Sequence, residues 1–175
     1  MIETKRLQFR PYQWTDLDFL ASLWANPDVV RYIGNGKTKN IEEIRALFPA
    51  WVKRSQSGFG LQVAVLKESG EPIGHAGLIR QEVDGKHEWE IGYWLAKKYW
   101  GQGFATEAAL GFRDHAVQQL GISRVISIIQ PANHASIHVA QKIGMVKEKE
   151  TIFRSVPVLI YSLETSSKTS TQSRP

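Results

Sequence analysis

Residues 99–108, YWGQGFATEA, join a predicted strand to a predicted helix through a turn that contains two glycines. Gly101 and Gly103 carry no Cβ atom, so the backbone can turn tightly there and another group can approach its N–H atoms closely. The preceding residues, EWEIGYWLA, include the aromatic and β-branched side chains that are typical of a strand. After the glycines, apolar residues at every fourth position predict a helix of about four turns. These residues are Phe104, Ala108, Phe112, Ala116 and Leu120.

A helix that begins at a glycine turn is a suitable place to bind an anion. Its first N–H groups have no partner within the helix, and the positive end of the helix dipole lies beside them, so phosphate is the preferred ligand. Short glycine motifs also occur in ordinary connections between a strand and a helix. This stretch alone therefore leaves two interpretations open, a phosphate site and a plain connection.

The composition is that of a single globular domain. The chain has 175 residues, of which 42% are hydrophobic, and it contains no cysteine. The lack of cysteine excludes disulfides, thiolate metal sites and a cysteine nucleophile, and it is compatible with a reducing cytosol. No apolar leader and no run of 18 apolar residues is present, so we expect a cytoplasmic protein that does not enter a membrane. We expect no metal site.

The net charge of +5 raises the question of nucleic-acid binding. The basic residues are scattered along the chain, however, and Lys97–Lys98 is the only adjacent lysine pair. No sequence signature of an RNA-binding or zinc-finger domain is present. We therefore expect no nucleic-acid partner, and the positive charge favours an anionic small molecule.

The rest of the chain alternates between patterns of strand and helix. Strands are predicted near residues 6–12, 61–67, 72–81, 87–96, 124–129, 146–151 and 157–164, and helices at 15–24, 41–53, 104–120 and 133–143. The three strands between residues 61 and 96 are expected to form an antiparallel meander, followed by a strand-helix-strand crossover. We expect one domain over residues 1–165 and a disordered polar tail over residues 166–175.

Four motifs together resemble the GNAT superfamily of acyl-CoA-dependent N-acetyltransferases, and within it the branch typified by the RimJ/RimL ribosomal-protein acetyltransferases. They are ETKRL (3–7), IGYWL (91–95), WGQGFATEA (100–108) and NHASIHVAQKIGM (133–145). The resemblance spans nearly the whole expected domain. It implies an α/β (α+β) fold with a mixed, mostly antiparallel sheet of about six to seven strands and helices on both faces.

The resemblance also implies a function. The expected reaction transfers an acetyl group from acetyl-CoA to a primary amine, on a protein N-terminus or a small molecule, by direct attack in a ternary complex. A homodimer is compatible with this expectation. The alternative is a catalytically silent domain of the same fold that binds acyl-CoA or a partner.

By resemblance, the glycine turn wraps the pyrophosphate of acetyl-CoA, and the strand before it pairs through its backbone with the pantetheine arm. The Asn133 side chain is implied to bind the pantetheine, although asparagine is also a favoured helix N-cap. Many relatives carry Arg or Gln where this chain has Trp100, so phosphate binding here would depend more on backbone amides. The cofactor residues implied in this way are Tyr93, Trp94, Leu95, Gln102, Gly103, Phe104, Ala105, Thr106, Asn133 and Ser136.

Acetyl transfer requires a base for the amine, a donor for the oxyanion and a proton for the departing thiolate. Glu90 is the preferred base and Glu88 the second choice, since both lie on one face of the predicted strand. Two solvent-facing glutamates are an equal alternative, and a bulge would change which one faces inward. The oxyanion is expected on the backbone N–H of Tyr93 or Trp94.

The third catalytic group is the donor that protonates the departing thiolate. Relatives often place a tyrosine where this chain has Ala140, so Ser136 is the nearest hydroxyl and the candidate acid, with a helix cap as its other interpretation. His75 is expected to be a structural residue, and Tyr32 to lie near the acceptor without a chemical role.

Overall fold

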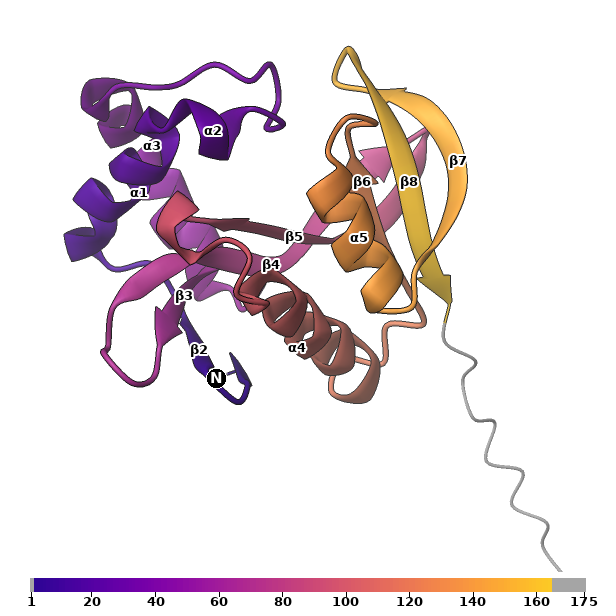
Figure 1. The fold of residues 1–175 in the computed structure, drawn as a ribbon, viewed down its shortest axis with the longest axis horizontal. Helices are drawn as coiled ribbons and strands as arrows, with labels where there is room; N and C mark the ends of the chain where they lie inside the picture. The colour runs from indigo at the N-terminus through magenta and orange to yellow at the C-terminus, as the bar shows by residue number, and fades with distance from the viewer. Residues whose placement is uncertain (1, 165–175) are drawn as a thin grey trace, which may run out of the picture.

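An eight-stranded sheet in the order β1-β2-β3-β4-β5-β6-β8-β7 runs through the protein, here a computed structural model that describes residues 2–164 (Figure 1). The strands are β1 (Ile2–Glu3), β2 (Leu7–Arg10), β3 (Gly60–Leu66), β4 (Pro72–Val83), β5 (Lys86–Leu95), β6 (Arg124–Ile129), β7 (Val146–Phe153) and β8 (Val156–Glu164). The α-helices are α1 (Leu17–Ala25), α2 (Pro27–Val30), α3 (Ile41–Gln56), α4 (Phe104–Gln118) and α5 (His134–Lys142). Two 3₁₀ turns, η1 (Trp14–Asp16) and η2 (Lys97–Tyr99), complete the secondary structure.

The mixed, mostly antiparallel sheet predicted from the sequence is confirmed, with one strand more than expected. The additional strand is β1, whose two residues are too few to show an alternating pattern. No helix within residues 2–164 is long and apolar enough to cross a membrane. The tail predicted for residues 166–175 lies outside the described residues, and the single domain over 1–165 stays a prediction.

Helices cover both faces of the sheet. Neighbouring residues of β3 show this, because Val63 packs into a core beneath α1 and α3 while Ala64 packs into the core beneath α4 and α5. Successive side chains of a strand point to opposite faces, so each strand contributes to both cores. The larger core includes Phe104 and Phe112 from α4 and Ala140 from α5.

Strands β3, β4 and β5 form the predicted antiparallel meander. The pairing of β4 with β5 is unbroken from Gly74 opposite Leu95 to Val83 opposite Lys86, so no bulge interrupts this pair. At Gly77 the strands approach so closely that a Cβ would lie 1.9 Å from the carbonyl oxygen of Gly60. Only glycine fits there without moving the backbone.

The sheet divides between β5 and β6, its only parallel pair of strands within residues 2–164. These strands share a single pair of Cα partners, Glu90 and Ile126, and then separate. Helix α4 makes the connection between them, as the predicted crossover requires. Beyond Ile91 one edge of β5 is therefore left without a neighbouring strand.

We predict that Gly77→Ala destabilises the fold, because the added methyl group would collide with backbone and not with a flexible side chain. The melting temperature should fall by at least about 4 °C, corresponding to about 2 kcal/mol. Glu82→Ala, at an exposed position of the same strand, is the control. Equal melting temperatures for the two variants would contradict the close approach of β3 and β4.

Candidate active site

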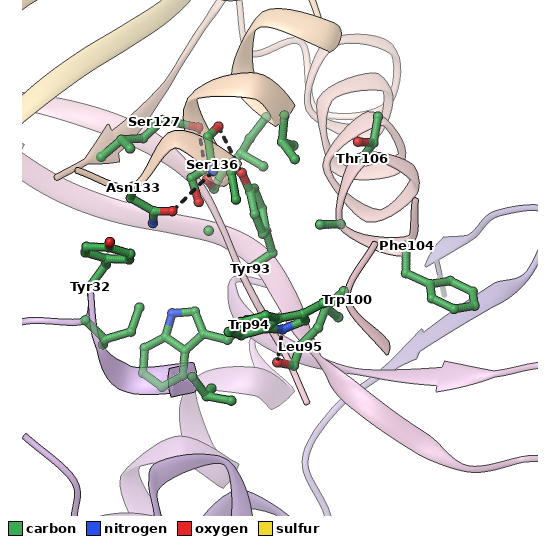
Figure 2. A pocket seen from close by; sticks show the side chains of 18 of the residues that line it. Tyr32, Tyr93, Trp94, Leu95, Trp100, Phe104, Thr106, Ser127, Asn133 and Ser136 are labelled. Carbon is green, nitrogen blue, oxygen red and sulfur yellow. Dashed lines mark hydrogen bonds between the residues drawn. The ribbon is translucent and has the colours of Figure 1, made fainter. Parts of the chain in front are cut away.

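A cavity of about 450 Å³ lies between the separated ends of β5 and β6 (Figure 2). This volume is within the range of small-molecule sites. Of the predicted site residues, all line the cavity except Gln102 and Glu88. Those that line it are Glu90, Tyr93, Trp94, Leu95, Gly103, Phe104, Ala105, Thr106, Asn133 and Ser136.

The free edge of β5 exposes backbone groups of alternate residues to this cavity. The N–H of Ala96 donates to the carbonyl of Ile73 at 2.9 Å, so even-numbered residues of β5 direct their backbone groups toward β4. Odd-numbered residues direct theirs toward the cavity. Trp94 therefore reaches the cavity with its indole and not with its N–H, which removes it as the predicted oxyanion donor.

Two side chains cap the ends of this free edge by donating hydrogen bonds to its first and last carbonyls. The Ser127 hydroxyl donates to the carbonyl of Ile91 at 3.2 Å, and the Trp100 indole donates to the carbonyl of Leu95 at 2.8 Å. Figure 2 shows this Trp100 contact at the end of the strand. Between the two caps lie the N–H and C=O of Tyr93 and the N–H of Leu95. An extended ligand with amide groups can pair with these three groups as a guest strand would.

The glycine turn has the conformation that the sequence suggested. Gly101 and Gly103 have φ angles of 73° and 80°, in the left-handed region, and Gly103 is the N-cap of α4. The first turn of α4 follows, and its N–H groups have no partners within the helix. Its residues Phe104, Ala105 and Thr106 line the cavity. The phenyl ring of Phe104 points away from it, so that residue contributes backbone (Figure 2).

A set of polar contacts from the N-terminal segment supports this turn. Glu107 accepts hydrogen bonds from the Thr4 hydroxyl and from the Arg6 N–H and Nε, each at 2.6 Å. Arg6 also donates from Nη1 to the carbonyl of Gln102 at 3.0 Å, and its guanidinium lies 4.1 Å from the centroid of the Phe104 ring. Thr4 and Arg6 belong to the motif ETKRL, but their partners Gln102 and Glu107 lie about 100 residues away, so the motif alone indicated no role for them.

These contacts neutralise a carboxylate that would otherwise oppose anion binding. Burial acts to raise the pKa of Glu107, but the hydrogen bonds from Thr4 and Arg6 outweigh it and lower the pKa. Glu107 is thus a carboxylate in the first turn of α4, with Arg6 as its counter-ion. Gln102 supplies a carbonyl to Arg6, and its side chain donates to the Lys98 carbonyl at 3.0 Å, outside the cavity lining.

Asn133 and Ser136 meet at the start of α5. The Asn133 side-chain oxygen accepts from the N–H of Ser136 at 3.2 Å, so Asn133 is the N-cap of α5. The cap uses only the oxygen, which leaves the two donors of the side-chain NH₂ group. The Tyr93 hydroxyl donates to the Ser136 carbonyl at 3.4 Å, and burial raises the pKa of Tyr93 to about 12. Two hydroxyl-bearing residues, Tyr93 and Ser136, therefore meet at this end of the cavity.

The two candidate bases have different surroundings. Glu90 lines the cavity and accepts a hydrogen bond from Gln81 Nε2 at 2.6 Å. Burial raises the pKa of Glu90, although this bond and the charge of Arg154 oppose the shift. Glu88 instead forms an ion pair with Arg124 at 3.0 Å and does not line the cavity. The structure therefore brings Glu90, and not Glu88, to the candidate site.

His75 and Tyr32 occupy different places. His75 is fully buried, its Nδ1 lies 2.5 Å from the Tyr12 hydroxyl, and burial lowers its pKa to about 3. The ring also stacks on Trp51 with centroids 5.3 Å apart, and this buried, neutral environment fits the structural role expected for His75. Tyr32 lines the cavity beside Trp94 (Figure 2). Its loop is held by Gln130, whose Nε2 donates to the Tyr32 and Gly34 carbonyls at 3.2 and 3.1 Å.

Comparison with known proteins gives the family. The sequence pattern of the acetyltransferase (GNAT) domain matches residues 6–146. The chain belongs to this family. It is 34% identical to the uncharacterized protein YkkB of Bacillus subtilis, over 90% of this chain and 92% of that one. It is 30% identical to the uncharacterized N-acetyltransferase p20 of Bacillus licheniformis, over 83% and 82% of the two chains.

A solved structure shares the whole fold. The GNAT acetyltransferase from Bacillus anthracis aligns with a TM-score of 0.78 at 25% identity, covering 93% of this chain and 97% of that one. The protein is thus an acetyltransferase of the GNAT family, with acetyl-CoA as its co-substrate. Within residues 2–164 no group of three or more His, Asp or Glu side chains is arranged to hold a metal ion.

We predict that Gly103→Asp lowers the affinity for acetyl-CoA by more than tenfold, about 1.4 kcal/mol, measured by titration calorimetry. The substitution puts a negative charge at the N-terminus of α4, where the phosphates are expected. Gly121→Asp is the matched control, because Gly121 also has a positive φ angle but lies beyond the other end of α4. Equal affinities for both variants would contradict a phosphate site at the turn.

We predict that Arg6→Met weakens acetyl-CoA binding about tenfold, because Glu107 loses its counter-ion beside the phosphates. Adding Glu107→Gln should then restore most of the affinity, since no charge remains to be neutralised. Lys5→Met, an exposed neighbour, makes the same change in net charge and should leave the affinity unchanged. A double variant that binds no better than Arg6→Met would show that Arg6 acts through the shape of the turn and not through charge.

Proposed function

We propose that the protein transfers the acetyl group of acetyl-CoA to a primary amine within a ternary complex. The observation that carries the proposal is the free edge of β5. Its unpaired backbone groups at Tyr93 and Leu95 lie in a cavity that has the N-terminus of α4 along one side and Glu90 at the point where β5 and β6 separate.

The residues present fit the co-substrate. In the proposed complex the amide groups of the pantetheine pair with the backbone of Tyr93 and Leu95, while the pyrophosphate accepts from the N–H groups of the glycine turn and the first turn of α4. The Asn133 NH₂ group supplies a further donor to the pantetheine. Gln102, Gly103, Phe104, Ala105 and Thr106 remain the proposed phosphate residues, with Gln102 contributing its backbone only.

The chemistry follows from the groups at the inner end of the cavity. Glu90 accepts the proton of the ammonium group, directly or through water, and the rise of its pKa on burial makes it a stronger base than an exposed carboxylate. The amine nitrogen then bonds to the thioester carbonyl carbon, and a backbone N–H of the free edge, that of Tyr93, stabilises the oxyanion. As the carbon–sulfur bond breaks, the positively charged nitrogen loses its second proton and the thiolate gains one, relayed through the Ser136 hydroxyl or a water that it holds, so that Ser136 ends protonated.

The acceptor on this proposal is a protein N-terminus or a small amine. The motifs favour the RimJ/RimL branch, and RimL, solved with coenzyme A, shares the fold at 18% identity and a TM-score of 0.73. A cytoplasmic location and a homodimer are parts of the same proposal. The alternative function, a silent acyl-CoA-binding domain, predicts binding of acetyl-CoA without release of free CoA thiol against any amine.

We predict that Glu90→Gln lowers kcat about 100-fold or more at neutral pH, with part of the rate recovered at higher pH as the amine loses its proton unaided. Acetyl-CoA affinity should barely change. Glu88→Gln is the control, because its carboxylate is paired with Arg124 outside the cavity. Normal rates for Glu90→Gln over the whole pH range would exclude Glu90 as the base.

The same assay tests the proton donor. Ser136→Ala should reduce kcat less than Glu90→Gln, because water can replace a hydroxyl that only relays a proton. Tyr93→Phe removes the other hydroxyl at this end of the cavity while keeping the backbone of β5. If Tyr93→Phe costs more activity than Ser136→Ala, the Tyr93 hydroxyl is the donor and the assignment of Ser136 is wrong.

A further inference from the structure

We propose that the acceptor is a small α-amino acid with an apolar or aromatic side chain, and that Arg154 binds its carboxylate while its amine lies at Glu90. This inference rests on the proposed acetyl transfer and names its substrate class.

The first observation is a pair of opposite charges joined by one amide. Gln81 donates from Nε2 to Glu90 Oε2 at 2.6 Å and accepts at Oε1 from Arg154 Nη2 at 3.2 Å. Gln81 therefore fixes a carboxylate and a guanidinium at adjacent positions. An α-amino acid carries its ammonium and carboxylate groups on one carbon atom, so a single small molecule can meet both.

The turn between β7 and β8 holds Arg154 beside Gln81, at the rim and not among the residues that line the cavity. Arg154 and Ser155 both have left-handed φ angles, 49° and 65°, which makes a tight two-residue connection. The turn lies on the same side of the molecule as the loop after α2, which contributes Tyr32 to the cavity (Figure 1). Arg154 is exposed, and Gln81 uses one of its five N–H donors. A guanidinium with further donors suits bidentate binding of a carboxylate.

The second observation is that the cavity lining has too few acidic side chains to bind an acceptor with several positive charges. The acidic residues that line the cavity are Asp28 and Glu90. Asp28 is already paired with Lys97 at 2.6 Å and Arg31 at 3.2 Å. A polyamine or aminoglycoside would bring several ammonium groups to one remaining carboxylate and to the positive charge of Arg154, which is unfavourable.

The third observation concerns size and polarity. The 450 Å³ cavity must hold the thioester end of the co-substrate as well as the acceptor. Gln130 fixes the loop of Tyr32, which forms part of the cavity wall, through its hydrogen bonds to the Tyr32 and Gly34 carbonyls. The walls near the acceptor include Tyr32, Ile33 and the Trp94 indole. These surfaces favour a small acceptor whose side chain is apolar or aromatic.

The experiment measures release of CoA thiol with matched acceptors. L-leucine, L-methionine and L-phenylalanine are each compared with their amide and with the amine that lacks the carboxylate, and spermidine is added as a polycation. The values of kcat/KM are expressed per neutral amine, because the amino groups of these compounds differ in pKa. The amino acids should exceed their amides and decarboxylated amines by about tenfold or more.

The variant Arg154→Gln tests the residue itself. It should raise KM for the amino acids about tenfold and leave kcat/KM for the decarboxylated amines within about twofold. Arg45→Gln, at an exposed arginine of α3, is the matched control and should change neither.

The outcomes distinguish failure of the amino-acid assignment from failure of the proposed acetyl transfer. Turnover that favours spermidine or the decarboxylated amines overturns the amino-acid assignment and leaves acetyl transfer intact. An equal effect of Arg154→Gln on all acceptors overturns the role of Arg154. Binding of acetyl-CoA without thiol release from any acceptor overturns the proposed function and this inference with it.

Discussion

The separation of β5 from β6 is the constraint on which the rest of the site depends. Buried backbone N–H and C=O groups require hydrogen-bond partners, and a strand that loses its neighbour inside a protein must obtain them from elsewhere. Here side chains satisfy the two ends of the free edge, through Ser127 at Ile91 and Trp100 at Leu95. In the proposed complex the groups between them pair with the pantetheine arm of acetyl-CoA, whose amides have the hydrogen-bonding pattern of a strand.

The same arrangement gives the Trp100 side chain a role. An Arg or Gln side chain at this place would add polar groups beside the glycine turn, whereas Trp100 uses the single polar group of its side chain to cap the carbonyl of Leu95. The negative charge of Glu107 in the first turn of α4 is neutralised by Arg6, which comes from the N-terminal segment. Anion binding on this account depends on the helix N-terminus with its nearby negative charge removed, and less on a cation that contacts the phosphates directly.

Local signals in the sequence were sufficient for the elements of the fold and for most of the cavity lining. The glycine turn, the period of α4 and the strand alternation each depend on neighbouring residues, and they predicted the meander, the crossover and the residues beside the turn. The sequence could not separate Glu90 from Glu88, because Arg124, which pairs with Glu88, comes from the strand across the crossover. Arg6, Gln130 and Arg154 were missed for the same reason, since their partners lie far away in the chain and only the folded sheet brings them together.

The central claim is that the free edge of β5 receives the co-substrate as a guest strand, and residue-resolved amide hydrogen exchange tests it most directly. On adding acetyl-CoA, the N–H groups of Tyr93 and Leu95 should become strongly protected, while that of Trp94, directed toward β4, should be protected with or without the ligand. Saturating acetyl-CoA that leaves the exchange of Tyr93 and Leu95 unchanged would contradict the account.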